Sequence, residues 1–168
     1  MATRHKKKAG LSPGTLVHTG DRKMEKVRLS VFEYDSEGLE RYEPADIKGA
    51  LQPPHRRVKW LNIDGLHDLE LLEKVGQKYQ LHPLVLEDIA HTAQRPKMEE
   101  FDDYIYVVLK MLTYNEHQDR INSEQVSLIL GKGYVVSFQE APGDVLEPLR
   151  QRITTVSYTH LTLPTKRI

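Results

Sequence analysis

Two adjacent carboxylates, Glu87 and Asp88, are the first candidates for chemistry in this chain of 168 residues. They fall in Pro83–His91, which we expect to be helical, because proline suits a first helical turn, where its missing N–H has no intrahelical partner. Neighbours on a helix point about 100° apart, so the pair cannot chelate one ion unless one side chain turns. It could serve two ions, or ions shared with another chain, since Mg²⁺ often takes only one or two carboxylates. The alternative is a solvated acidic face.

A denser acidic group precedes a long apolar segment and consists of Glu99, Glu100, Asp102 and Asp103. Paired carboxylates can act as general acid and base or hold a catalytic metal. These four residues would therefore form the site of a stand-alone Mg²⁺-dependent hydrolase. Before a buried strand, however, such a group is more often an exposed loop, and we expect a loop here.

The remaining motifs favour structural roles. Gly131-Lys132-Gly133 lacks the preceding loop and trailing Ser or Thr of a phosphate-binding loop, and we interpret it as a hairpin turn. The histidines show no spacing that demands zinc, and no serine stands in a nucleophile-elbow context. We assign no catalytic and no cofactor-binding residue.

The composition excludes several classes of protein. The chain has 24 Lys and Arg against 24 Asp and Glu, a formal net charge of zero and no cysteine. Without cysteine there are no disulfides, iron–sulfur clusters or thiol catalysis. The balanced charge argues against a dedicated nucleic-acid-binding protein, which usually has a basic excess.

The apolar segments are too short for a membrane helix, which needs roughly 20 apolar residues. The densest run, Tyr104–Leu109, ends at Lys110. The basic start, Met1–Lys8, is not followed by the apolar region of a secretory signal. We therefore expect these residues by themselves to form a soluble protein.

The charge is distributed unevenly along the chain. Residues 1–28 carry eight Lys and Arg against two acids, residues 82–119 carry eight acids against three bases, and no acid follows Glu147. One interpretation is that the acidic middle binds a cation while the basic ends approach an anionic membrane surface, at about 1 kcal/mol per basic residue. The other is solvated surface around a flexible basic N-terminus.

Hydrophobic periodicity predicts the main elements of an α+β fold, a mixed sheet with helices against it. Leu69, Leu72, Val75 and Tyr79 form one helical stripe. The segment 101–114 is apolar on both faces, which predicts a central strand covered on both sides. We expect strands at 27–34, near 39–43, and at 58–63, 101–114, 125–130 and 134–138, and helices at 68–80, at 83–91 and after Asp144 with Val145, Leu149 and Ile153.

Six motifs in order carry a resemblance to a known family. They are Trp60-Leu-Asn-Ile-Asp-Gly-Leu66, His82-Pro-Leu-Val-Leu-Glu-Asp88, Gln94-Arg-Pro-Lys97, Val107-Val-Leu-Lys-Met111, Glu124-Gln-Val-Ser-Leu-Ile-Leu130, and Ser137-Phe-Gln-Glu140 with Pro142-Gly-Asp-Val145. Together they resemble the N-terminal cytoplasmic domain of CorA-type magnesium and cobalt transporters over roughly residues 9–153.

The resemblance implies a mixed β-sheet sandwiched between α-helices, in a homopentamer. It implies that the full-length parent continues into a stalk helix and two transmembrane helices in the cell membrane, with this domain on the cytoplasmic side. It further implies that regulatory Mg²⁺, with Co²⁺ as a second possibility, binds between neighbouring subunits and holds the pore shut. Glu87 and Asp88 correspond to the family's acidic pair on this sensor, and their partner acids come from the stalk and the adjacent subunit.

The expected organisation has three parts: a flexible basic N-terminus at 1–10, a CorA-like cytoplasmic regulatory domain at 11–153, and a tail at 154–168 that departs from the family. The tail contains five threonines, no acid and Pro164, a composition that disfavours the long helix of the family. Our hypothesis is that the tail is foreign sequence, and the alternative is a divergent natural C-terminus. Two rival functions are the Mg²⁺-dependent hydrolase and a soluble module that binds a partner at the sheet edge.

Overall fold

The computed structural model describes residues 15–20, 22–116, 118–143 and 146–160, with residues 156–160 described by their backbone alone. The expected flexible N-terminus at 1–10 and the last part of the tail, with Pro164, lie outside the described residues.

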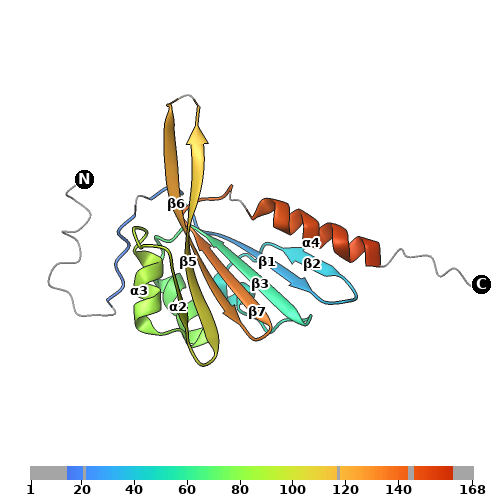
Figure 1. Ribbon diagram of the computed structural model, residues 1–168. Helices are drawn as coiled ribbons and strands as arrows, with labels where there is room; N and C mark the ends of the chain where they lie inside the picture. The colour runs from blue at the N-terminus through green and yellow to red at the C-terminus, as the bar shows by residue number, and fades with distance from the viewer. Residues whose placement is uncertain (1–14, 21, 117, 144–145, 161–168) are drawn as a thin grey trace, which may run out of the picture.

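One mixed sheet of seven strands organises the chain, in the order β2-β1-β3-β7-β6-β5-β4 (Figure 1). Strand β3 pairs parallel with β7, and every other pair is antiparallel. This confirms the predicted α+β class with a mixed sheet. The strands are β1 (Arg28–Tyr34), β2 (Leu39–Tyr42), β3 (Val58–Asp64), β4 (Lys97–Glu100), β5 (Tyr104–Asn115), β6 (Arg120–Gly131) and β7 (Tyr134–Gln139).

Helices lie on both faces of the sheet, as the sandwich prediction requires. Side chains alternate along β3, so Leu61 and Ile63 enter the main core while Trp60 points to the opposite face. The main core is closed by α2 (Leu69–Tyr79) and α3 (Pro83–Ala90), with the short α1 (Ile47–Ala50) at its edge. The opposite face carries α4 (Glu147–His160), which lies over β1 and β2 (Figure 1).

Helix α2 matches its prediction in position, and all four residues of its predicted stripe contact the core. It begins where the Asp68 carboxylate accepts the N–H of Leu71 at 3.0 Å, as an N-cap does. Leu72 and Val75 of the predicted stripe are buried in the core, and Leu69 and Tyr79 pack against it. Leu71 and Gly76, which the prediction left out, are buried as well. Gly76 allows close packing on α3, because a Cβ there would lie 2.4 Å from Leu86 Cδ1.

The prediction that the strand at 101–114 is central and covered on both sides is wrong. Strand β5 is second from the sheet edge. Its face with Tyr104, Tyr106 and Val108 is buried, whereas Met111 is the one buried residue of β5 on the other face. On the other face Ile105 is 37% and Leu109 46% exposed. The reason is that α4 lies over β1 and β2, at the end of the sheet remote from β5.

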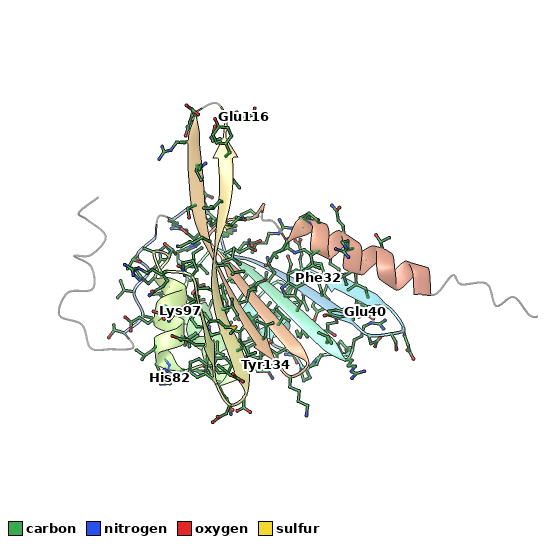
Figure 2. The ribbon with its side chains drawn as sticks, in the orientation of Figure 1. Phe32, Glu40, His82, Lys97, Glu116 and Tyr134 are labelled. Carbon is green, nitrogen blue, oxygen red and sulfur yellow. The ribbon has the colours of Figure 1, made fainter. Side chains whose placement is uncertain are left out.

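The loop predicted at Glu99–Asp103 is also partly wrong, because Glu99 and Glu100 belong to the edge strand β4. The hairpin prediction at Gly131-Lys132-Gly133 is confirmed by the turn that joins β6 to β7. A second hairpin, β5–β6, is longer than predicted and projects beyond the rest of the sheet, with Glu116 near its tip (Figures 1 and 2).

Helix α4 continues past Ile153 to His160, although the threonine-rich composition there disfavours a helix. The hydroxyls of Thr154 and Thr155 donate to the carbonyls of Arg150 and Gln151, each at 2.9 Å. These bonds place polar side chains against the preceding turn of the helix. Helicity to His160 does not bear on the origin of residues 154–168, and the foreign-tail hypothesis stays a prediction.

Candidate metal site on helix α3

Helix α3 presents its two predicted ligands at the edge of the core. His82 precedes the helix, where its ring Nδ1 accepts the N–H of Leu84 at 3.2 Å, and Pro83 occupies the first turn. Val85, Leu86, Ile89 and Ala90 of α3 are buried, and Glu87 and Asp88 are half-buried at its flank. The sequence therefore places both carboxylates on a short helix that packing holds rigid.

The Asp88 carboxylate pairs with a lysine from the edge strand. Lys97 Nζ lies 2.6 Å from Asp88 Oδ2 and 2.8 Å from Glu99 Oε1 (Figure 2 labels Lys97 beside α3). Lys97 and Glu99 are two positions apart on β4, so their side chains share one face of the strand, the face that α3 covers. One ammonium group thus joins a carboxylate of the helix to a carboxylate of the sheet.

The second oxygen of Asp88 is held by the turn that follows α3. Gln94 Nε2 donates to Asp88 Oδ1 at 2.5 Å and lies 3.0 Å from His91 Nδ1. The main-chain N–H of Gln94 in turn donates to Gln125 Oε1 at 3.0 Å. Both Asp88 oxygens therefore have fixed partners, which determines the rotamer of the side chain.

The electrostatics favour the charged form of Lys97. Partial burial opposes the charge, but the hydrogen bonds to Asp88 and Glu99 outweigh it and raise the pKa of Lys97 above its ordinary value. The ammonium also lies 5.5 Å from the centroid of the Tyr106 ring, within the range of a cation–π contact. Burial raises the pKa of the Tyr106 hydroxyl, so that ring stays neutral.

Comparison with known proteins identifies the family of this chain. The family described as CorA-like Mg²⁺ transporter protein matches residues 55–165, more than half of the chain. The chain belongs to this family. It is 44% identical over 149 residues to the cobalt/magnesium transport protein CorA of Thermotoga maritima, in a match that covers 87% of this chain and 42% of the relative. The chain therefore spans less than half the length of that relative.

Solved structures share the fold of this CorA-like chain. The full-length CmaX protein matches 80% of this chain and 41% of its own with a TM-score of 0.61 at 14% identity. The cytoplasmic domain of ZntB from Vibrio parahaemolyticus matches 79% of this chain and 50% of its own with a TM-score of 0.54 at 13% identity. In the described part of this chain, no helix is long and apolar enough to cross a membrane.

The residues around Asp88 suit a hard cation but do not complete a site in one CorA-like chain. Asp88 and Glu99 already hold one cationic group, the Lys97 ammonium, and carboxylate oxygens are the ligands that Mg²⁺ prefers. Among the described residues, no three His, Asp or Glu side chains gather in a way that could hold a metal ion. Any full coordination shell would need water or residues from outside this set.

The four acids of the hydrolase alternative are not brought together. Glu99 and Glu100 are neighbours on β4, so they point to opposite faces, and Glu99 pairs with Lys97. Asp102 and Asp103 lie exposed in the turn before β5. This arrangement offers no acid and base on the two sides of a common substrate position.

Sequence reasoning missed Lys97 and Gln94 as the partners of Asp88. Both residues lie in the motif Gln94-Arg-Pro-Lys97. If the segment had been interpreted as a strand, the two-residue spacing of Lys97 and Glu99 would have indicated that they share a face. The acidic neighbourhood instead favoured a loop.

A second ionic group, remote in sequence from α3, is fully buried between β1 and β3. Lys59 Nζ lies 3.5 Å from Glu33 Oε1, and the two side chains are 3% and 0% exposed. Burial alone would raise the pKa of Glu33, but hydrogen bonds from His55 N–H and the Tyr42 hydroxyl, together with Lys59, lower it. Burial lowers the pKa of Lys59, whose ammonium also donates to the Gln52 carbonyl at 2.7 Å. Every charge here has a partner, which is typical of a structural group.

Proposed function

We propose that this chain is the cytoplasmic Mg²⁺-sensing part of a divalent-cation transporter, with Glu87 and Asp88 as ligands at a contact between subunits. The observation that carries the proposal is the Lys97 ammonium, which lies 2.6 Å from Asp88 Oδ2 and 2.8 Å from Glu99 Oε1. The two carboxylates thus already bind one cationic group. This group lies in a chain of the CorA-like Mg²⁺ transporter family, in a carboxylate pair whose side chains are 21% and 43% exposed. Among the residues that the structure describes, the ligand set is incomplete, which supports a site completed by another subunit.

The chain's own residues contribute position and charge to this mechanism. Helix α3, fixed by its buried face and by Gln94, holds Asp88 in one orientation. Carboxylates that face each other across a subunit contact repel by about 4 kcal/mol at ~4 Å and an effective dielectric near 20. That repulsion is offset when Mg²⁺ is bound between them. To move the protein from almost fully open to almost fully closed, the free energy of Mg²⁺ binding must differ by about 5.5 kcal/mol between the two states. Several equivalent subunit contacts can each contribute a part of this difference.

The proposal places the chain in a homo-oligomer, a pentamer in the full-length protein, on the cytoplasmic side of the cell membrane. The similarity to the ZntB cytoplasmic domain supports this side of the membrane. The relative's name, cobalt/magnesium transport protein, supports Mg²⁺ with Co²⁺ as the second ion. The activity proposed for the chain is regulatory and not enzymatic. This agrees with the separation of Glu99, Glu100, Asp102 and Asp103, the four acids of the hydrolase alternative.

Mg²⁺ titration of the purified chain tests the proposed ligands. Limited proteolysis of the 118–143 and 91–96 segments, followed against MgCl2 at constant ionic strength, should show saturable protection in the wild type. Asp88→Asn and Glu87→Gln should each weaken that protection, since each removes a charged oxygen ligand. Asp103→Asn is the matched control, because Asp103 is an exposed acid in the turn before β5.

Two results would contradict the proposal. One is protection in Asp88→Asn and Glu87→Gln equal to that in the wild type. The other is robust metal-dependent hydrolysis by the pure chain, which would favour the hydrolase alternative. Sedimentation of the chain with and without Mg²⁺ tests the oligomer, which should be favoured when the ion is present.

A further inference from the structure

We infer that Lys97 is a tethered competitor for the cation site at Asp88, and that it sets the Mg²⁺ concentration at which the site responds. The inference rests on the proposed function, because it concerns the regulation of the same carboxylate. It adds a role for a residue that is not a metal ligand.

The competition follows from the oxygens that Lys97 occupies. The ammonium lies 2.6 Å from Asp88 Oδ2 and 2.8 Å from Glu99 Oε1, both lengths of strong charge-assisted hydrogen bonds. Mg²⁺ binds carboxylate oxygens at about 2.0–2.1 Å with strict octahedral geometry. An ion at Asp88 Oδ2 would be in contact with the ammonium and repelled by it, so the oxygen can serve one cation at a time.

The Lys97 side chain can move into solvent when it is displaced. Its side chain is 30% exposed and Glu99 is 43% exposed, so water reaches the pair from one side. The flexible four-carbon stem lets the ammonium swing into solvent with little change of the backbone. Asp88 keeps its bond from Gln94 Nε2 during this exchange, so the carboxylate stays oriented for an incoming ion.

The exchange has two consequences for a sensor. With little Mg²⁺ present, the tethered ammonium neutralises one of the two negative charges of Asp88 and Glu99 and limits the repulsion between them. Because the tethered group never diffuses away, a free cation must outcompete it. A divalent ion is attracted to the two carboxylates twice as strongly as a monovalent ion at the same distance. The Lys97 ammonium therefore lowers the affinity of the Asp88 site for every cation, and a divalent ion displaces it more readily than a monovalent ion does.

Removing the ammonium tests the competition. Lys97→Met keeps the apolar stem and deletes the charge, and it should tighten apparent Mg²⁺ affinity by about 2–5-fold, the scale of partly exposed ion pairs. Arg95→Met is the matched control, because Arg95 is exposed and only two residues away, and removes the same charge without a bond to Asp88. It should shift the affinity by less than about twofold. Lys97→Arg, which keeps a cation, should stay near the wild-type affinity.

Direct observation of the ammonium separates this inference from the proposed function. In the wild type with ¹⁵N-labelled lysine, the Lys97 side-chain NMR signal should change on addition of MgCl2 with the same midpoint as the Asp88 carboxyl ¹³C signal. KCl at equal ionic strength should leave both signals nearly unchanged. If Asp88 responds to Mg²⁺ while Lys97→Met binds no more tightly than Arg95→Met, the competition is refuted and the ligand assignment stands. If Asp88→Asn leaves Mg²⁺ affinity unchanged in the wild-type and Lys97→Met backgrounds, the ligand assignment fails and the competition fails with it.

Discussion

Gln125 of β6 reaches the end of helix α3, where its Nε2 donates to the main-chain carbonyl of Asp88 at 3.2 Å. Its Oε1 accepts the N–H of Gln94 at 3.0 Å. The side chain is 1% exposed, so one buried amide joins strand β6 to the backbone on both sides of the turn behind the candidate site. The position of the Asp88 carboxylate therefore depends on a residue of the sheet 37 positions along the chain.

Gln125→Leu should destabilise the fold by about 1–3 kcal/mol, because it leaves the Asp88 carbonyl and the Gln94 N–H without their buried partner. Urea denaturation measures this change. Gln77→Leu is the control, since Gln77 is exposed on α2 and should change the free energy of unfolding by less than about 0.5 kcal/mol. Equal midpoints for the two variants would show that the amide does not support the turn.

Local chemistry explains which parts of the fold could be predicted. Pro83 with His82 marks the start of α3, and Gly131-Lys132-Gly133 marks a hairpin whose Gly133 has φ +79°. Each signal is contained in a few adjacent residues. The same reasoning located Glu87 and Asp88 on one helix.

The errors concern contacts between distant segments. Strand β4 is four residues long and polar, and only its register against β5 shows that Lys97 points to α3. The exposed face of β5 could not be predicted either, because apolar alternation does not reveal how far a helix from another part of the chain extends. Helix α1 is a single turn, too short for a periodic signal.

Lys59→Met should destabilise the chain strongly, by about 3–5 kcal/mol, because it leaves the Glu33 carboxylate buried without its cation. Thermal or urea unfolding at neutral pH measures the effect. Lys48→Met is the control, since Lys48 is exposed on α1. The double variant Glu33→Gln/Lys59→Met should recover part of the loss, and a double variant less stable than Lys59→Met alone would contradict the pairing.

The acid limb of the stability curve should depend on Glu33. Its pKa is lowered in the folded state, so its stabilisation is present above the ordinary carboxyl value of 4.5 and is lost as the pH falls through the lower folded value. In Lys59→Met, burial opposes the charge with less compensation, the pKa of Glu33 rises, and acid unfolding should begin at a higher pH. Circular dichroism during acid titration of the two proteins measures this shift, and coincident curves would rule out the coupling.

Gly76→Ala should be destabilising although alanine is the better helix former, because the new Cβ would lie 2.4 Å from Leu86 Cδ1. Overpacking of this kind costs about 1–3 kcal/mol. Gly38→Ala is the matched control, since its Cβ would meet only Arg56 side-chain atoms at 3.6 Å or more. Urea unfolding should separate the two, and addition of Leu86→Val should reduce the penalty at Gly76. A neutral Gly76→Ala would mean that α2 and α3 pack less closely than described.

Arg150 fixes α4 to the sheet through the one tryptophan of the chain. Its guanidinium carbon lies 5.1 Å from the centroid of the Trp60 ring, and one of its terminal nitrogens donates to Asn62 Oδ1 at 3.2 Å. Trp60 is 5% exposed, and its Nε1 donates to Ser137 Oγ at 2.8 Å. Arg150→Ala should therefore admit water to the indole and release the start of α4.

Trp60 fluorescence measures whether the start of α4 leaves the sheet. Emission from another tryptophan does not contribute, because the sequence has only one. Arg150→Ala should shift the emission to longer wavelength, increase quenching by iodide, and lower the free energy of unfolding by about 1–3 kcal/mol. Arg152→Ala is the control, since Arg152 is exposed two residues further along the same helix. Emission in Arg150→Ala identical to that in Arg152→Ala would show that the contact with Trp60 does not hold α4 on the sheet, and that the cover over β1 and β3 depends on other residues of the helix.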